Sequence, residues 1–258
     1  RNKPMINTEF NLTNIPQRTT KPRESGLTMV MDKGLSCREA EDFLEVAADK
    51  TDILKLGFGT SAVTPTLQRK IDIYREANIP IYFGGTLFEA YVIRGQFDDY
   101  KRLLDKFKMT HAEVSDGSIE ISEEEKCGYI RSLAKDFTVL SEVGSKDAEK
   151  IIPPYKWIAM MKAEIEAGAW KVIAEARESG TVGIFRNTGE VRSGLIEEIL
   201  QHIPLDTILW EAPIKTQQVW FMKLYGHNVN LGNIAPNEVI PLETLRLGLR
   251  GDTFDQWL

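Results

Sequence analysis

The chain has 258 residues, of which 42% are hydrophobic and 27% are charged, so it is long and apolar enough to bury a sizeable core. Its formal net charge of -6 argues against broad nucleic-acid binding, which needs a basic face, but permits a local cationic pocket. No apolar run approaches the roughly 18 residues that a membrane-spanning helix needs. We therefore expect a globular cytoplasmic protein without a membrane or nucleic-acid partner.

Eight short apolar runs, rich in β-branched and aromatic residues, recur along the chain and predict buried strands. In chain order they cover residues 28–31, 53–56, 79–83, 112–114, 138–140, 172–174, 208–210 and 229–231. Stretches with a 3.6-residue period between them predict helices at 39–48, 64–77, 122–133, 157–167, 195–203, 217–225 and 238–249. Thr64 is the expected N-cap of the second helix, with Pro65 at its first position.

This alternation of strands and helices predicts a single-domain (β/α)8 barrel, with an open doubly wound sheet as the alternative. The domain would span residues 1–258, and residues 1–26 would form an extension leading into the first strand. The segment 180–191 is long for a barrel turn and contains three glycines, so it is either a lid or an ordinary loop. Cys37 and Cys127 have no base partner in view and are expected to be free thiols in a reducing compartment.

Charged residues gather where the predicted strands end, which is where barrel enzymes carry their chemistry. Residues two apart on a strand share a face, so one register per strand would direct these groups toward the barrel axis. The groups are Lys33, Lys55, Glu113, Glu142, Lys146, Glu175, Arg177 and Glu211, with Asn228, Asn230 and Asn233 on the last strand. One charged residue at a strand end is usually a solvated or salt-bridged group, but seven of the eight strands share this feature.

Crowded carboxylates repel unless cations or a metal compensate them, and oxygen ligands suit Mg²⁺. Gly85 and Thr86 lie in a glycine-rich turn whose backbone could approach a ligand, although ordinary tight turns look the same. Gly232 and Asn233 lead from the last strand toward Pro236 at a helix start. That segment is either a phosphate site or a plain helix N-cap.

Ten motifs in order along nearly the whole chain resemble the phosphosulfolactate synthase family. They are Lys21-Pro22-Arg23, Asp32-Lys33-Gly34-Leu35, Lys55-Leu56-Gly57-Phe58-Gly59-Thr60, Gly84-Gly85-Thr86-Leu87-Phe88-Glu89, Glu113-Val114-Ser115-Asp116-Gly117, Ser141-Glu142-Val143-Gly144, Glu175-Ala176-Arg177-Glu178-Ser179-Gly180, Glu211-Ala212-Pro213, Asn228-Val229-Asn230-Leu231-Gly232-Asn233-Ile234 and Leu249-Arg250-Gly251-Asp252-Thr253.

The resemblance implies a Mg²⁺-dependent (β/α)8 barrel that adds sulfite to phosphoenolpyruvate and forms 2-phospho-3-sulfolactate. That product leads to coenzyme M in methanogens and to sulfolactate elsewhere. Related plant proteins are associated with heat stress. Two alternatives stay open: another Mg²⁺-dependent enzyme that forms an enolate from a phosphorylated acid, and a non-catalytic stress-associated barrel. A homo-oligomer is also expected.

Each site residue receives an expected role from this chemistry. Sulfite attack on C3 moves charge onto the carboxylate, which a metal would stabilise, and an acid must then protonate C2. We expect Lys146 to be the proton donor, although a solvated loop lysine would look the same in sequence. The other expected roles are metal binding by Glu142, Glu175, Glu211 and Glu113, and substrate binding by Lys33, Lys55, Arg177, Gly85, Thr86, Gly232 and Asn233.

Charged residues near the two chain ends are expected at the opposite face of the barrel, where they would contribute stability. Lys21 and Arg23 precede the first strand, and Arg246, Arg250 and Asp252 follow the last helix. Lys21 or Arg23 is predicted to pair with Glu243 or Asp252, closing the barrel or meeting another subunit.

Overall fold

Strands and helices alternate along residues 6–258, the part of the chain that the computed structural model describes. The strands are β1 (Thr28–Asp32), β2 (Ile53–Leu56), β3 (Ile81–Phe83), β4 (His111–Val114), β5 (Thr138–Val143), β6 (Ala169–Ala174), β7 (Ile208–Glu211) and β8 (Leu231–Ile234). Their hydrogen-bonded order is β3-β2-β1-β8-β7-β6-β5-β4, and every paired neighbour is parallel. β3 and β4 meet without a ladder, which nearly closes the barrel.

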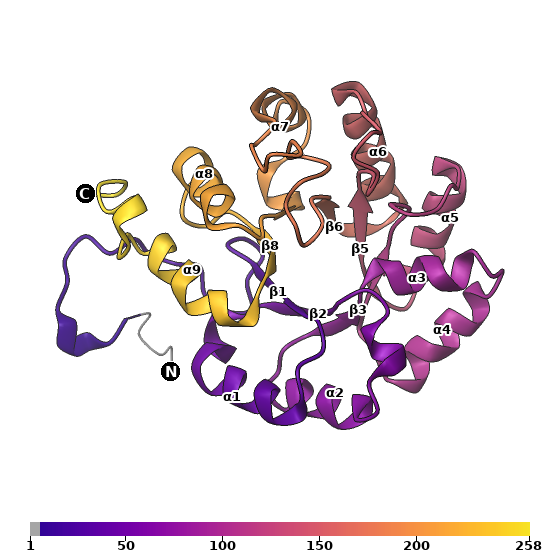
Figure 1. Cartoon of the computed structure of the whole chain (residues 1–258), viewed down its shortest axis with the longest axis horizontal. Coiled ribbons are helices and arrows are strands. Elements are labelled where there is room, and N and C mark those ends of the chain that lie inside the picture. Colours follow the sequence, from indigo (N-terminus) through magenta and orange to yellow (C-terminus); the bar gives the residue numbers. More distant parts are fainter. Residues whose placement is uncertain (1–5) are drawn as a thin grey trace.

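The helices form a ring around the strands in chain order, as Figure 1 shows. They are α1 (Cys37–Ala47), α2 (Leu67–Glu76), α3 (Gly85–Val92), α4 (Phe97–Lys106), α5 (Glu123–Leu133), α6 (Pro154–Ala167), α7 (Ser193–Leu200), α8 (Lys215–Tyr225) and α9 (Val239–Arg246). Short 3₁₀ helices are η1 (Thr8–Phe10), η2 (Ala48–Lys50), η3 (Thr60–Val63), η4 (Leu205–Thr207), η5 (Pro236–Glu238) and η6 (Gly251–Thr253). The predicted (β/α)8 barrel is confirmed.

Local sequence signals explain the starts of α1 and α5. Ser36 and Ser122 are N-caps that each form a capping box. The serine hydroxyl accepts a hydrogen bond from the backbone amide of the third helical residue, and the glutamate side chain at that position accepts one from the serine backbone amide. The predicted cap of α2 is wrong: Thr64 ends the 3₁₀ helix η3, and α2 begins at Leu67 after Thr66. The 3₁₀ helix therefore lies just before the expected start, and a turn at Pro65 and Thr66 separates it from α2.

The connection between β3 and β4 contains two helices, α3 and α4, that the sequence-based prediction omitted. Its start looked like a tight turn because of the glycine pair there, but Gly84 is the N-cap of α3. The apolar spacing in both helices follows the helical period, with Leu87 and Phe88 buried in α3 and Tyr100 and Leu104 buried in α4. That spacing was the missed signal.

The core has two layers, as expected when a barrel is packed inside a ring of helices. The inner layer fills the barrel with Leu27, Met29, Ile53, Tyr82, Leu140, Ile173 and Leu209. A larger outer layer lies between strands and helices and includes Trp157, Trp210 and Phe221. None of the described helices is long and apolar enough to cross a membrane.

The last strand begins two residues later than predicted, and this moves two asparagines to the opposite end of the barrel. Asn228 accepts a hydrogen bond from Arg18, and Asn230 accepts one from the Leu27 amide at 2.9 Å. Both residues precede β8, so the prediction that they lie at its C-terminal end is wrong. Only Asn233 lies there.

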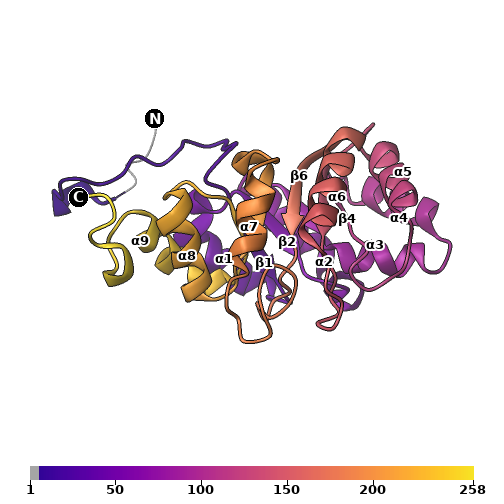
Figure 2. The ribbon, with the colours of Figure 1, turned by 90° about the horizontal axis from the view of Figure 1, so that it is seen from above.

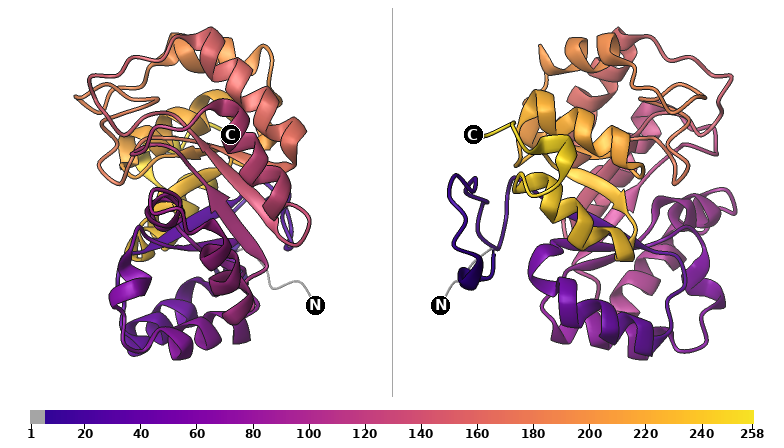
Figure 3. Two further views of the ribbon diagram at one scale, coloured as in Figure 1. Left: turned by 90° about the vertical axis from the view of Figure 1, so that its right-hand side faces the viewer. Right: turned by 60° about the vertical axis from the view of Figure 1, so that its left-hand side comes forward.

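The described segment ahead of β1 runs beside the C-terminal end of the chain, and both lie at the left-hand side of the molecule in Figure 2. Part of it stands away from the barrel in the right-hand view of Figure 3. Arg18 ties it down through an ion pair with Glu243 of α9 at 2.9 Å. Arg246 is fully buried nearby and donates to the carbonyls of Val229 and Leu27 at 2.7 and 3.0 Å, which confirms its place at this end.

The segment 180–191 packs closely against its surroundings. Ile184 and Phe185 are 0% and 2% exposed, and the Gln217 amide donates to the carbonyls of Gly180 and Gly189 at 2.9 and 3.0 Å. Of the two predicted alternatives, the contacts with α8 therefore favour a packed loop.

Candidate active site

Four ionisable side chains project into the barrel at the end where the strands have their C-termini. Lys55, Glu142, Glu175 and Glu211 each follow an inner-layer residue by two positions, which are Ile53, Leu140, Ile173 and Leu209 in turn. Successive side chains on a strand alternate between faces, so each group points along the same face as the core residue beneath it. The predicted facing of these four residues is confirmed.

Three of the carboxylates form a compact cluster above this inner layer. One oxygen each from Glu142, Glu175 and Glu211 lies within 4.8 Å of the others, and all three residues are buried. Backbone amides orient two of them: Arg177 N–H donates to Glu175 Oε1 at 2.7 Å, and Ala176 N–H donates to Glu211 Oε1 at 2.9 Å. Glu175 Oε2 is buried and has no hydrogen-bond partner among the described residues.

Lys55 lies beside the cluster, between two carboxylates. Its ammonium is 3.0 Å from Glu113 and 3.4 Å from Glu142. Glu113 also accepts a hydrogen bond from the Gly85 amide at 3.0 Å, and it lies outside the three-carboxylate cluster. A side chain at position 85 would collide with Glu113, because an added Cβ would lie 2.5 Å from Glu113 Oε1. Gly85 therefore lets α3 start directly against this carboxylate.

Lys146 enters the same space from the loop that follows β5. Its ammonium donates to Thr86 Oγ1 at 3.0 Å and lies 3.5 Å from both Glu89 and Glu142. Burial alone would lower the pKa of Lys146, but the surrounding carboxylates, led by Glu142, outweigh burial and raise that pKa above its ordinary value. The ammonium is thus kept charged beside the carboxylate cluster.

The site contains more carboxyl groups than ammonium groups, and this excess shifts their pKa values. Burial, followed by repulsion from Glu142, raises the pKa of Glu211 to about 8 and that of Glu175 well above its ordinary value. Burial would also raise the pKa of Glu142, but Lys146 and Lys55 overcome this and hold it below its ordinary value. Five buried carboxylates, counting Glu113 and Glu89, face two ammonium groups. One divalent cation would offset two of the negative charges, and the unpartnered oxygen of Glu175 is a ready ligand.

Glu89 is a member of this site that the predictions did not assign. It is 2% exposed on α3 and accepts hydrogen bonds from Ser115 Oγ at 2.9 Å and from the Ser118 amide at 2.7 Å. Its carboxylate links the start of the loop after β4 to Lys146. The helical spacing of Leu87 and Phe88 would have placed Glu89 on α3, but only the tertiary structure brings it to the lysine.

The remaining predicted binding residues divide into two groups. Arg177 and Asn233 line a cavity of about 40 Å³ above the cluster, together with Thr86 and Gly85, and Asn233 Oδ1 is buried without a partner among the described residues. Lys33 is exposed and is not among the residues lining that cavity. Gly232 faces the barrel interior, because a Cβ there would lie 2.6 Å from Leu209. The structure brings Gly232 against the inner layer and not into the cavity.

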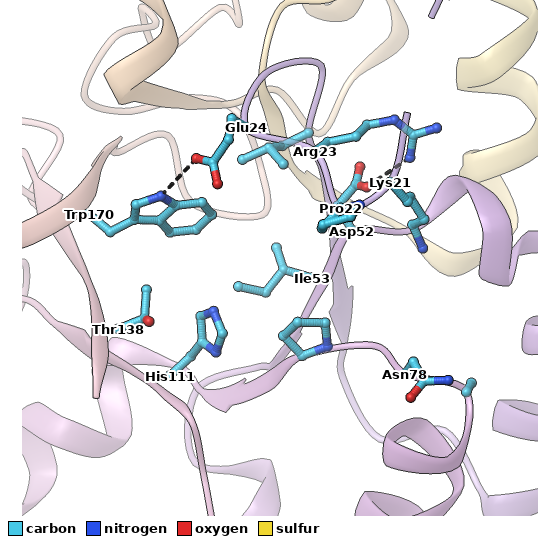
Figure 4. A pocket seen from close by; sticks show the side chains of 13 residues that line it. Lys21, Pro22, Arg23, Glu24, Asp52, Ile53, Asn78, His111, Thr138 and Trp170 are labelled. Carbon is cyan, nitrogen blue, oxygen red and sulfur yellow. Dashed lines mark hydrogen bonds and ion pairs between the residues drawn. The ribbon is translucent and has the colours of Figure 1, made fainter. Parts of the chain in front are cut away.

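A larger cavity of about 570 Å³ lies at the opposite end of the barrel (Figure 4). Lys21 and Arg23 border it, which confirms that they lie away from the carboxylate cluster, but their predicted partners are wrong. Arg23 pairs with Asp52 at 2.8 Å, and Lys21 donates to backbone carbonyls at Ala48 and Thr51. The cation that reaches Glu243 is Arg18, and Asp252 is 3.4 Å from Lys215.

The cysteines take no part in the site. Both Cys37 and Cys127 are buried free thiols on the outer helices, as predicted. Burial, reinforced by Glu123, raises the pKa of Cys127 to about 11, so this thiol stays protonated and unreactive at neutral pH.

Comparison with known proteins gives three findings. The profile of the family described as (2R)-phospho-3-sulfolactate synthase matches residues 16–252. Phosphosulfolactate synthases from Bacillus subtilis and Methanothermobacter thermautotrophicus are 43% and 41% identical to the chain, over 93% and 92% of it and 96% and 95% of their own lengths. The solved structure of 3-hexulose-6-phosphate synthase from Salmonella typhimurium has a TM-score of 0.57 at 14% identity, covering 87% of this chain and all of its own, which supports the barrel fold.

Proposed function

We infer that this chain, which belongs to the (2R)-phospho-3-sulfolactate synthase family, is a phosphosulfolactate synthase that adds sulfite to C3 of phosphoenolpyruvate. High identity over nine tenths of the chain supports the overall reaction. The observation that carries the mechanism is the meeting of the Lys146 ammonium with a cluster of three buried carboxylates.

We propose Mg²⁺ as the cofactor, held by Glu142, Glu175 and Glu211. The charge excess of the site and the unpartnered Glu175 oxygen favour a hard divalent cation with oxygen ligands. The cavity of about 40 Å³ above these residues has room for an ion and a few waters. When bound, Mg²⁺ would supply positive charge beside the substrate carboxylate as electrons move onto it. Glu113 would stay paired with Lys55 and keep that lysine beside the cluster.

The protein residues would guide the electrons and one proton. The sulfur lone pair of sulfite forms a bond to C3, and the π electrons between C2 and C3 move through C2 onto the carboxylate. Lys146 then gives one proton to C2, which restores the carboxylate. Its ammonium suits this role because three neighbours fix its position, namely Thr86, Glu89 and Glu142, and because its raised pKa keeps the proton present before the reaction.

Anion binding is proposed for the groups that line or border the cavity. Arg177 is exposed at its rim and has a left-handed backbone with φ of 59°, which directs its amide to Glu175. Its guanidinium, for which the described residues provide no partner, would bind phosphate or sulfite. Lys55 is buried and paired, so we assign it charge compensation beneath the substrate. Because Lys33 is exposed and does not line the cavity, it would attract the anions only through solvent.

A direct assay tests the reaction. Purified protein is incubated with phosphoenolpyruvate, sulfite and Mg²⁺, and 2-phospho-3-sulfolactate is measured by mass spectrometry. Lys146→Ala should lower turnover by about 10²–10⁴-fold, as expected for loss of a general acid. Lys150→Ala, an exposed lysine nearby, is the matched control and should retain turnover. Absence of product from the unmodified protein across pH 6 to 9 would refute the proposed reaction.

We also propose a homo-oligomer in the cytoplasm. Large apolar side chains near both termini are exposed, including Phe10 and Leu12 before β1 and Phe254 and Leu258 at the end of the chain. Exposed apolar side chains gathered near one another favour contact with another subunit. Sedimentation at several protein concentrations measures the state, and a single monomeric species would contradict this proposal.

A further inference from the structure

A buried lysine on one of the outer helices donates a hydrogen bond to the backbone of a site residue, although its own side chain lies outside the site. Lys126 is 0% exposed on α5, in the outer layer between helices and strands. Its ammonium meets three acceptors, which are Asp116 Oδ1 at 2.9 Å, the Glu142 carbonyl at 2.6 Å and Glu164 at 2.5 Å. An ammonium has three hydrogens to donate, so the whole group is committed to these partners.

The bond to the Glu142 carbonyl replaces a backbone hydrogen bond that the β4–β5 pairing does not supply. Carbonyls alternate between the two sides of a strand, and the Val143 carbonyl accepts from Glu175 N–H on the β6 side at 3.0 Å. The Glu142 carbonyl therefore faces β4. The β4–β5 register ends at Val114 and Ser141, so no strand residue follows to donate to that carbonyl. The Lys126 ammonium takes the place of the missing backbone N–H.

The bond to Asp116 fixes the loop after β4, and that loop packs on Lys146. The Gly117 carbonyl accepts from Lys146 N–H at 3.1 Å. A Cβ added at Gly117 would lie 3.0 Å from Lys146 Cγ, so the loop backbone lies directly along the lysine side chain. The Ser118 amide donates to Glu89, which contacts the Lys146 ammonium. One cation thus fixes both the strand end and the loop between which Lys146 lies.

A buried ammonium is an unfavourable way to fill space, because its desolvation costs several kcal/mol that its partners must offset. Glu164 shares this environment: Ser141 Oγ donates to its Oε1 at 3.0 Å, while its Oε2 has no partner among the described residues. Apolar side chains in place of both Lys126 and Glu164 would fill this space at lower cost. What the buried ammonium adds is a set of directional hydrogen bonds to the strand end and the loop.

We propose that Lys126 is a positioning residue, which holds the end of β5 and the loop after β4 at the separation that places the Lys146 ammonium against Glu142. Its role in turnover rests on the proposed function. Its effect on the geometry does not, because the contacts involved are backbone and side-chain bonds present without substrate.

The test compares Lys126→Met with Lys171→Met. Lys171 is also a buried lysine that donates to two backbone carbonyls, at Glu24 and Asp206, but it lies at the opposite end of the barrel. Both variants should lose stability. Lys126→Met should also lose kcat by at least about tenfold, with the KM for phosphoenolpyruvate changed less, because a displacement of an ångström can lower the rate by about 10². Lys171→Met should retain kcat.

Hydrogen exchange provides the readout that does not depend on the reaction. In Lys126→Met the amides of Ser118 and Lys146 should exchange faster by at least about tenfold, because the bonds that close them depend on the loop position. Lys171→Met should leave both amides unchanged. Unaltered exchange at both amides in Lys126→Met would overturn the proposal, whether or not the wild-type protein turns over phosphoenolpyruvate. Faster exchange with unchanged kcat would also overturn it, provided that the wild type is active.

Asp116→Asn provides the second variant if Lys126→Met does not fold. Asp116 is 23% exposed at its side chain and its neutral analogue keeps the shape of the group, so the fold should tolerate the change. Lys126 would then keep its bonds to the Glu142 carbonyl and Glu164 but hold the loop more weakly. The Ser118 amide should exchange faster and kcat should fall. Wild-type values for both measurements would refute the positioning role.

Discussion

Replacement of Lys55 by methionine removes the only ammonium that contacts both Glu113 and Glu142, among the residues described. Both carboxylates are buried, at 0% and 3% exposed, so bulk water solvates neither of them fully once the cation is lost. Loss of one partner from a buried ion pair destabilises a protein by about 3–5 kcal/mol. For a chain of this size that corresponds to a decrease in Tm of about 6–20 °C.

The effect of Lys55→Met should also grow with pH. Burial raises the pKa of Glu113 to about 7 even though Lys55 opposes this, so removal of Lys55 raises that pKa further. Above pH 7 the folded variant then keeps a proton on Glu113 that the unfolded chain and the folded wild type have lost. Stability falls with pH wherever the folded state binds more protons. The variant should therefore lose about 1.4 kcal/mol per pH unit relative to wild type above pH 7.

Urea unfolding at pH 6, 7, 8 and 9 measures this difference. Lys50→Met is the control, because Lys50 pairs with Asp49 at the surface and such pairs contribute about 0–1 kcal/mol. A loss in Lys55→Met no larger than in the control would show that the ion pairs do not stabilise the fold. A difference from wild type that stays constant between pH 7 and pH 9 would refute the proposed protonation of Glu113.

Three further predictions concern the metal, the glycine at the start of α3 and the opposite end of the barrel. Glu175→Gln should weaken Mn²⁺ binding by at least about tenfold in calorimetry without substrate, and unchanged affinity would exclude this carboxylate as a ligand. Gly85→Ala should displace Glu113, 2.5 Å from the added Cβ, and lower kcat at least about tenfold, whereas Gly251→Ala enters open space and should not. Burial lowers the pKa of His111 to about 4, so the unfolded chain binds this proton first as pH falls. Stability should therefore decrease between about pH 6.5 and pH 4 by more in wild type than in His111→Gln, and equal decreases would contradict that cause.

The sequence by itself determined the barrel and the facing of its strand ends. Eight apolar runs alternate with seven predicted helical stretches, and a right-handed crossover between parallel strands leaves few arrangements for such a repeat. The two-residue period of a strand then fixed Lys55, Glu142, Glu175 and Glu211 on the inner face. These are local properties, since each follows from the residues of one strand.

Partners across the barrel were decided by tertiary structure. Arg23 could have reached Asp52, Glu243 or Asp252 as far as charge alone is concerned, and the path of the segment before β1 selected Asp52. In the sequence, Lys126 is one more charged residue on α5. Its bond to the Glu142 carbonyl forms because the β4–β5 pairing ends at Val114 and Ser141, which leaves that carbonyl without a backbone donor from β4. A pattern of apolar and charged residues specifies which face a side chain takes. The partner of that side chain depends on where the other strands end and on the path of the loops. The distances between such groups are set only when the barrel closes.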